Sequence, residues 1–130
     1  MTSVRLWAQV CIPLIAGSFG RVRLAQHKTT GQFIALKILK KAEILKLKQA
    51  DHVQSEVNIL NTIDHPFLIK MHGVSQDDKY LILYLDYIPG GELFNYLRSI
   101  GNLNNEEAKF YAGQVALMFE YLHSKDIIYR

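Results

Sequence analysis

The first third of the chain restricts the possible folds most, because three strand-like segments follow one another there with only short turns between them. An apolar segment spans 6–15, and Val22 and Leu24 then alternate with polar residues. A second apolar run spans 33–39, after a polar stretch in which Gly31 is placed as a turn residue. Three consecutive strands with short connections most simply form an antiparallel meander.

The hydrophobic period changes to that of a helix in the middle of the chain. From Asp51, the expected N-cap, apolar residues recur at helical spacing until 64–66, where a proline ends the pattern. Two more strand-like runs, 68–74 and 80–87, flank a polar turn and predict a second hairpin. The fold class is therefore predicted to be α+β, with a five-stranded antiparallel sheet and a helix after its third strand.

The last third predicts two helices after a break at 86–91, which contains one proline and two glycines. A short helix over about 92–100 ends at Gly101, and a longer helix starts near Asn104. Asn104 and Glu107 have the spacing of a capping box. The longer helix carries an apolar stripe that we interpret as a core-packing face: Phe110, Val115, Phe119 and Leu122.

Composition limits the class of protein. With 130 residues, of which 49% are hydrophobic and 21% charged, the chain can build one core but not two. Its formal net charge of +3 is spread out, except for the lysine-rich stretch 37–48. That stretch contains no aromatic residue to stack on a base, which argues against binding of nucleic acid. We interpret it as the solvated face of a strand end and a short helix.

The number of cysteines, the spacing of the histidines and the length of the apolar runs argue against further classes of protein and site. The single cysteine, Cys11, cannot form an intrachain disulfide, which fits a reducing cytoplasm. The five histidines lack the spacing of a zinc site, and we expect no metal ligands. No stretch reaches the ~20 apolar residues of a membrane span. Residues 6–16 loosely imitate a secretory signal, but Gln9 and Pro13 interrupt the run, which favours a first strand.

The sequence Gly17-Ser18-Phe19-Gly20 falls between the first two predicted strands. Because glycine has no side chain, backbone N–H groups in such a turn can approach phosphate oxygens. A Rossmann loop runs from a strand into a helix, and a Walker loop needs Gly-Lys-Ser/Thr, so neither type fits. Glycine turns between strands are common, and this turn alone is weak evidence for a nucleotide site.

Lys37 follows the apolar sequence Ile34-Ala35-Leu36 in the third predicted strand. A charge in such a place is costly unless it is paired. Glu56, on the following predicted helix, is placed to form that pair. An ordinary structural ion pair is the alternative. The order of glycine turn, strand lysine and helix glutamate is, however, that of the phosphate-positioning site of protein kinases.

Five segments resemble protein kinases of the AGC group, with the cAMP-dependent branch the best match. They are 17–24, 35–39, 65–68, 86–94 and 119–123. The resemblance runs from about Ala16 to Arg130. It implies a kinase small lobe at 16–87, made of the five-stranded sheet and helix C, and the hinge with helices D and E of the large lobe at 88–130. It also implies a serine/threonine kinase that uses ATP and, in the complete enzyme, Mg2+. Protein substrates, a regulatory subunit and a cytoplasmic location that extends to the nucleus are implied as well.

The resemblance implies roles for individual residues. Lys37 would hold the α- and β-phosphates of ATP, and Glu56 would hold Lys37. Leu85 would be the gatekeeper, and Glu92 would meet the ribose and an arginine of the protein substrate. His52 would contact the activation-loop phosphate, although a plain surface histidine is the alternative. The remaining ATP contacts would be Ile15, Ala16, Gly17, Ser18, Phe19 and Gly20 in the loop, Val22 and Ala35 against adenine, Ile69 on the pocket floor, and the backbone of Asp86 and Ile88 at the adenine edge.

Two departures from the family pattern lie at the ends of the sequence. Ile15 takes the place of the first loop glycine, although a β-branched residue resists unusual backbone angles. Residues 1–15 also fail to match the first strand of the family, and we hypothesise that they are foreign to the fold. The sequence ends at Arg130, where the family continues with the catalytic aspartate, the magnesium ligands and the activation loop. We therefore expect no phosphoryl transfer by these residues alone. We favour an incomplete record of an active kinase over the alternative, a truncated binding module without catalysis.

Overall fold

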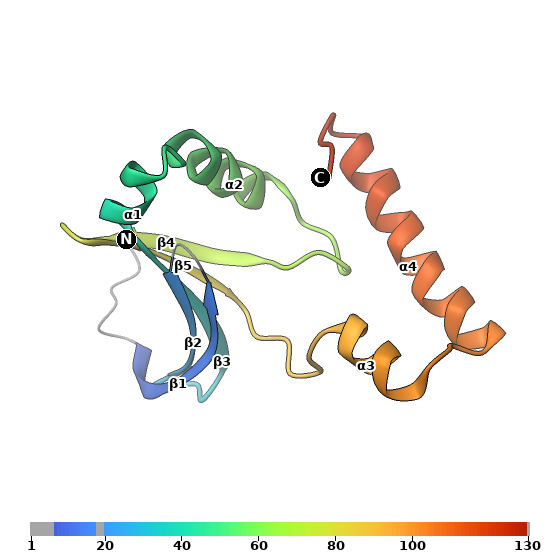
Figure 1. Ribbon diagram of the computed structural model, residues 1–130. Helices are drawn as coiled ribbons and strands as arrows, with labels where there is room; N and C mark the ends of the chain where they lie inside the picture. Colours follow the sequence, from blue (N-terminus) through green and yellow to red (C-terminus); the bar gives the residue numbers. More distant parts are fainter. Residues whose placement is uncertain (1–6, 18–19, 130) are drawn as a thin grey trace. The chain divides into compact units, whose positions relative to one another are not determined.

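The computed structural model describes residues 7–17 and 20–129, with side chains from Gly20 onward (Figure 1). The chain divides into two compact units. The sheet unit comprises Met1–Thr62 and Ile69–Tyr87, and the helical unit comprises Ile63–Leu68 and Ile88–Arg130. Residues 63–68 therefore belong to the helical unit, although the residues that precede and follow them in the sequence belong to the sheet unit.

The sheet unit contains a five-stranded antiparallel sheet in the order β1-β2-β3-β5-β4. Its strands are β1 (Trp7–Gly17), β2 (Gly20–His27), β3 (Phe33–Lys40), β4 (Met71–Gln76) and β5 (Tyr80–Asp86). Two helices, α1 (Lys41–Lys46) and α2 (Ala50–Thr62), lie between β3 and β4 in the chain. The predicted fold class, the meander of the first three strands and the short helix in the lysine-rich stretch are confirmed.

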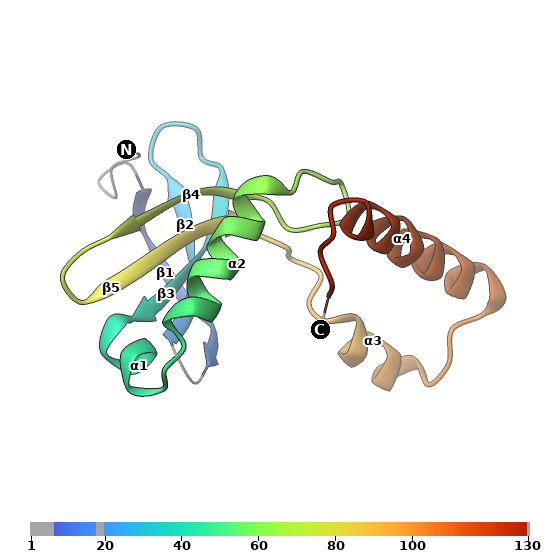
Figure 2. The same ribbon diagram turned by 90° about the horizontal axis from the view of Figure 1, so that it is seen from above.

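One face of the sheet packs against α1 and α2 (Figure 2). Residues directly opposite each other in an antiparallel pair share a face, so Ala35 of β3 and Leu85 of β5 point the same way. Val57 of α2 packs in the same buried cluster. The whole cluster consists of Ala35, Leu39, Ile44, Val57, Leu83 and Leu85. Burial of these apolar side chains fixes α2 against the middle of the sheet.

The opposite face carries a second buried cluster, formed by Ala25, Ile34 and Tyr84. The Tyr84 hydroxyl lies 2.9 Å from the Ser75 hydroxyl, so the buried ring keeps a polar partner for its oxygen. Since β3 and β5 contribute apolar side chains to both faces, they are apolar along most of their length instead of alternating. This explains the continuous apolar run at 33–39.

Two predicted boundaries are wrong. α2 begins at Ala50, so Asp51 is a residue of its first turn and not its N-cap. A carboxylate there still favours the helix, because it lies near the positive end of the helix dipole. β4 begins at Met71 instead of Leu68. The preceding residues form a turn in which the N–H of Leu68 donates to the carbonyl of His65, at 3.1 Å.

The helical unit contains α3 (Leu93–Ile100) and α4 (Asn105–His123). The predicted capping box at the start of α4 is confirmed. The N–H of Glu107 donates to Asn104 Oδ1 at 2.9 Å, and the N–H of Asn104 donates to the Glu107 carboxylate at 3.0 Å. Gly101 follows α3 with a φ of 83°, a left-handed conformation that glycine adopts without strain.

The apolar stripe of α4 is only partly packed. Leu122 is buried, but Phe110 is 64% exposed and Val115 is 44% exposed. In the described part of the helical unit no second layer covers these two residues, so the interpretation as a core-packing face stays a prediction. Near the end of α4, the Tyr121 hydroxyl accepts the N–H of Asp64 at 2.8 Å and so joins the 63–68 segment to the helix.

Asp77 caps the turn of the β4–β5 hairpin. Its Oδ1 accepts the N–H groups of Lys79 and Tyr80, at 2.8 Å and 2.6 Å, and these bonds lower the pKa of the carboxyl below its usual 3.8. A carboxyl with a lower pKa in the folded state stabilises the fold above its unfolded pKa, and this stabilisation disappears as the pH falls through the folded pKa. We expect Asp77→Asn to flatten the fall in stability with pH on the acid side of 3.8. Urea midpoints of the two proteins between about pH 2 and pH 6 measure this, and parallel curves would contradict it.

Candidate active site

Lys37 and Glu56 form an ion pair between β3 and α2. Lys37 Nζ lies 2.5 Å from Glu56 Oε1, and the two side chains are 30% and 40% exposed. The pair predicted from the sequence is therefore present, and it borders solvent instead of lying deep in the core. Because an ammonium group has three N–H donors, Lys37 can hold Glu56 and still donate to an anionic ligand.

The backbone around the pair fixes where Lys37 points. Lys37 stands opposite Val22 of β2 and Leu83 of β5, and opposed residues share a face. That is the face against which α2 packs. In α2, Val53 and Leu60 lie about one turn on either side of Glu56, and both pack on the buried cluster. The packing of α2 therefore holds the carboxylate near the ammonium.

Apolar side chains adjoin the ammonium on the same face. Ala35 stands opposite Leu24 of β2 and Leu85 of β5, two residues before Lys37 along β3. Ala35 and Leu85 are each 8% exposed, and Val22 packs against their cluster. The structure thus brings Val22, Ala35 and Leu85, three of the predicted ATP contacts, together beside the cation. Such a surface suits a ligand with a flat apolar part and an anionic part.

The glycine turn connects β1 and β2. Gly17 ends β1, Gly20 begins β2, and the two glycines are paired in the sheet register. Ser18 and Phe19, which were also predicted to cover the phosphates, lie outside the described residues. The predicted turn position is confirmed, whereas its contact with phosphates stays a prediction.

Ile15 lies in the strand that leads into this turn, just after a shift in the β1–β2 register between Pro13 and Ile15. Its backbone belongs to β1 and pairs with Val22, and Ala16 pairs with the next residue back along β2. The chain reverses only after Gly17, and Ile15 is not among the described non-glycine residues with a positive φ, which are Lys48 and Asp126.

Gly20 is needed by the sheet itself, which the sequence did not reveal. A Cβ atom on Gly20 would lie 1.9 Å from the carbonyl oxygen of Ile38 in β3. We therefore expect Gly20→Ala to destabilise the fold by about 1–3 kcal/mol without any nucleotide present, because two strand backbones would have to separate. Thermal unfolding measures the change. Gly113→Ala is the control, since no heavy atom lies within 4 Å of that position and alanine favours a helix. Equal midpoints for Gly20→Ala and wild type would contradict the expectation.

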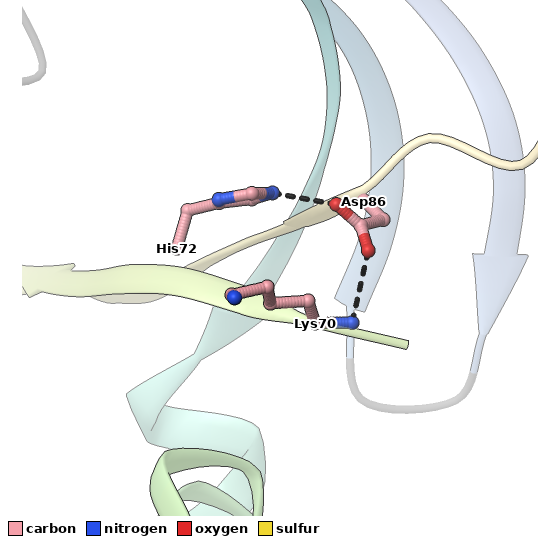
Figure 3. A network of polar contacts seen from close by, with 3 residues as sticks. All are labelled: Lys70, His72 and Asp86. Carbon is pink, nitrogen blue, oxygen red and sulfur yellow. Dashed lines mark hydrogen bonds and ion pairs between the residues drawn. The ribbon is translucent and has the colours of Figure 1, made fainter. Parts of the chain in front are cut away.

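Asp86, the last residue of β5, makes three polar contacts, and Figure 3 shows those of its carboxylate. Its N–H donates to the Lys70 carbonyl at 3.0 Å, and its Oδ2 accepts the Lys70 N–H at 3.1 Å. Its Oδ1 lies 2.6 Å from His72 Nε2. Because the N–H of Asp86 is already bound to Lys70, the predicted backbone contact with adenine would have to be made by the Asp86 carbonyl oxygen. Sequence analysis did not single out His72, because no sequence pattern indicates the irregularity in β4 at that residue.

Three other residues were predicted to contact ATP, and the structure gives the element and unit to which each belongs. Ile69 precedes β4 in the sheet unit and is 40% exposed. Ile88 is 63% exposed and Glu92 directly precedes α3, and both belong to the helical unit. The Glu92 side chain makes no capping hydrogen bond with α3. The roles of these residues toward ATP and substrate stay predictions.

His52 lies in the first turn of α2, with its Nδ1 2.6 Å from Gln49 Oε1. Its role toward an activation-loop phosphate also stays a prediction. Across the residues that the structure describes, no three His, Cys, Asp or Glu side chains gather in a way that could hold a metal ion. Within the same residues, no helix has the length and apolar character needed to cross a membrane.

Comparison with known proteins places this site in a family. The model of the protein kinase domain matches residues 13–130. The chain belongs to the protein kinase family. It is 51% identical over 122 residues to cAMP-dependent protein kinase type 3 of Saccharomyces cerevisiae, a match that covers 94% of the chain and 31% of that kinase.

Two further kinases show the same relationship. The chain is 51% identical over 114 residues to the cAMP-dependent protein kinase catalytic subunit of Arthrobotrys oligospora and 46% identical over 114 residues to the catalytic subunit PRKX of Mus musculus. Each match covers 88% of the chain, but only 22% and 32% of the respective relatives. The predicted kinase resemblance is confirmed. The chain spans less than a third of the length of these three kinases. Its sheet unit with α2, followed by α3 and α4, corresponds to a kinase small lobe and the first helices of the large lobe.

Proposed function

We propose that this chain is the ATP-binding part of a protein serine/threonine kinase that resembles cAMP-dependent protein kinase. The complete enzyme transfers the γ-phosphate of ATP to serine or threonine side chains of proteins. The observation that carries the proposal is the 2.5 Å ion pair between Lys37 of β3 and Glu56 of α2. It lies on the sheet face that also presents Val22, Ala35 and Leu85.

The chemistry of the pair fits phosphoryl transfer. This reaction depends mainly on positioning the triphosphate and on neutralising its charge. The Lys37 ammonium binds the α- and β-phosphates, and Glu56 keeps the ammonium in place instead of letting it turn to solvent. Glu56 is thus a positioning residue, whereas Lys37 touches the nucleotide.

The other predicted residues complete the proposed site. Leu85 acts as the gatekeeper, with Val22 and Ala35 against the adenine ring. Glu92 meets the ribose and an arginine of the protein substrate, which gives a preference for basic sequences. The remaining contacts are the loop residues Ile15, Ala16, Gly17, Ser18, Phe19 and Gly20, the side chain of Ile69, and the backbone of Asp86 and Ile88.

Protein kinases hold Mg2+ with an aspartate and an asparagine that the family pattern places after Arg130. We assign Mg2+ to the complete kinase and to none of these side chains. The 130 residues also lack the aspartate that accepts the proton of the substrate hydroxyl. We therefore propose that a polypeptide of these residues alone binds ATP but transfers no phosphate. Any phosphopeptide formed by the purified polypeptide would contradict this.

The test of the proposed function uses the endogenous protein. An antibody raised against residues 51–61 captures it from cells, and its mass, its transcript and its activity are then measured. The proposal expects a mass above 14.9 kDa, an aspartate codon directly after Arg130, and transfer of phosphate from ATP to serine in a basic peptide. A transcript with a stop codon after Arg130 and a captured protein without activity would contradict it.

One observation favours a second candidate, a truncated kinase-like module that binds a partner without catalysis. Phe110 and Val115 are exposed on α4, and large exposed apolar surfaces often mark binding sites. The stop codon in the test above is the outcome that this candidate expects. For the favoured enzyme, we propose protein substrates and a regulatory subunit as partners, and the cytoplasm and nucleus as its locations.

A further inference from the structure

β4 contains an irregularity at the residue that faces the end of β5. Met71 pairs with Leu85, whereas Gly73 pairs with Tyr84, so two steps along β4 correspond to one step along β5. His72 is the extra residue of this bulge. Bulges bend the strand and redirect a side chain, and they often occur next to functional sites.

The redirected His72 side chain meets the carboxylate of Asp86 (Figure 3). Because a carboxylate only accepts hydrogen bonds, His72 Nε2 carries the proton of the 2.6 Å contact. The second carboxylate oxygen and the N–H of Asp86 are both bound to the backbone of Lys70, at 3.1 Å and 3.0 Å. Asp86 is thus fixed to the start of β4 by three separate contacts.

Asp86 is also held on its other side. It is the register partner of Ile34 in β3, and the ring of the following Tyr87 lies 6.4 Å from the ring of Phe33. The chain leaves the sheet unit directly after Tyr87. The end of β5 is therefore held by contacts on both sides. In the proposed function, the backbone of Asp86 at this end contacts the edge of the adenine ring.

We propose that His72 and Asp86 are positioning residues for the nucleotide. Through the bulge and the hydrogen bond between their side chains, they fix the direction of the Asp86 carbonyl, without touching ATP through their side chains. This inference rests on the proposed function, since it names how that site is held in shape. Both side chains are about one-third exposed, at 32% for His72 and 36% for Asp86. The pair therefore contributes modestly to stability, and its main effect is on the shape of the site.

The test compares variants of the 130-residue chain. The dissociation constant is measured for an ATP analogue with a fluorescent group on its ribose, together with amide hydrogen exchange and the urea midpoint. We expect His72→Ala to weaken binding by about threefold to fivefold and to speed exchange of the Asp86 amide. His72→Gln, which keeps a donor for the carboxylate, is expected to bind within about twofold of wild type.

The matched control is Ser75→Ala. It removes the 2.9 Å contact with the Tyr84 hydroxyl in the same hairpin, but at the end of β4 away from Asp86. We expect it to lower the urea midpoint and to leave the dissociation constant unchanged. Equal weakening by Ser75→Ala and His72→Ala would show a general loss of hairpin stability and would overturn the positioning role.

A second comparison keeps the proposal testable if His72→Ala does not fold. Asp86→Asn weakens the contact with His72 but still accepts the Lys70 N–H, and it is expected to bind about threefold more weakly than wild type. Where His72→Ala folds, the double variant is expected to bind no more weakly than His72→Ala alone, because the two residues act as one unit. If the losses of affinity in the two single variants added up in the double variant, the inference would be overturned. If wild type binds and none of these variants binds more weakly, only the inference fails, whereas a wild type that does not bind overturns the proposed function as well.

Discussion

Lys37→Met is expected to weaken the binding of ATP by at least about tenfold, because hydrogen bonds to charged groups contribute about 1.5–3 kcal/mol and each 1.4 kcal/mol is a factor of ten. The fold should survive. Methionine has a similar length, and the Glu56 side chain is 40% exposed, so water can solvate the carboxylate that loses its partner. Binding is measured by fluorescence titration, and the fold by circular dichroism and the urea midpoint.

The control for this substitution is Lys109→Met. Lys109 also forms an ion pair, at 3.1 Å with Glu106, but both side chains are exposed on α4, at 74% and 85%. A pair of that kind contributes little, so neither binding nor stability should change. Glu56→Gln gives the intermediate case, because glutamine keeps a hydrogen-bond acceptor for Lys37 but not the charge. Equal affinities for wild type and Lys37→Met would show that the phosphates do not meet this lysine.

Leu83→Ala is expected to have the largest effect on stability. Leu83 has no exposed surface, and it belongs with Ala35 and Val57 to the buried cluster that joins the sheet to α2. Removal of a buried leucine side chain costs about 2–5 kcal/mol, through the lost burial and the cavity left behind. A small domain has a total stability of about 5–15 kcal/mol, so this loss is a large part of it. The urea midpoint should fall sharply, and nucleotide binding should fall with it.

Leu45→Ala is the matched control for the core. It makes the same chemical change on α1, where Leu45 is 69% exposed, and its midpoint should stay close to that of wild type. If Leu83→Ala and Leu45→Ala had the same midpoint, the buried cluster would not be what holds the sheet to its helices.

Local sequence signals were enough to predict much of this fold. The alternation at Val22 and Leu24 and the apolar run at 33–39 indicated strands, because period and burial are linked in a sheet. Asn104 and Glu107 indicated a helix start, because a capping box satisfies backbone donors over four residues. The pairing of Lys37 with Glu56 was predictable for a different reason. A charge inside an apolar strand needs a partner, and the sequence offered a carboxylate on the next helix.

Features that depend on contacts between distant segments were not predictable. Asp51 had the chemistry of an N-cap, but helix boundaries are decided by backbone geometry as well as by residue type. Gly20 looked like a phosphate-binding glycine only, whereas its close approach to the Ile38 carbonyl requires the register of β2 and β3. The contact of His72 with Asp86 depends on a bulge, which leaves no periodic signal in the sequence. The partner of the apolar stripe that contains Phe110 was not predictable either, because a stripe indicates a surface to be covered and not what covers it.

The most direct test of the central claim is to find where a reactive nucleotide attaches to the chain. The reagent is an adenosine analogue that carries a sulfonyl fluoride in place of the phosphates and modifies amines held beside it. Mass spectrometry of the digested, labelled 130-residue chain then locates the adduct. If ATP binds on the sheet face beside the Glu56 pair, the adduct lies on Lys37 and ATP suppresses it. Adducts spread over exposed lysines such as Lys40 and Lys109, at the same level with and without ATP, would contradict the account.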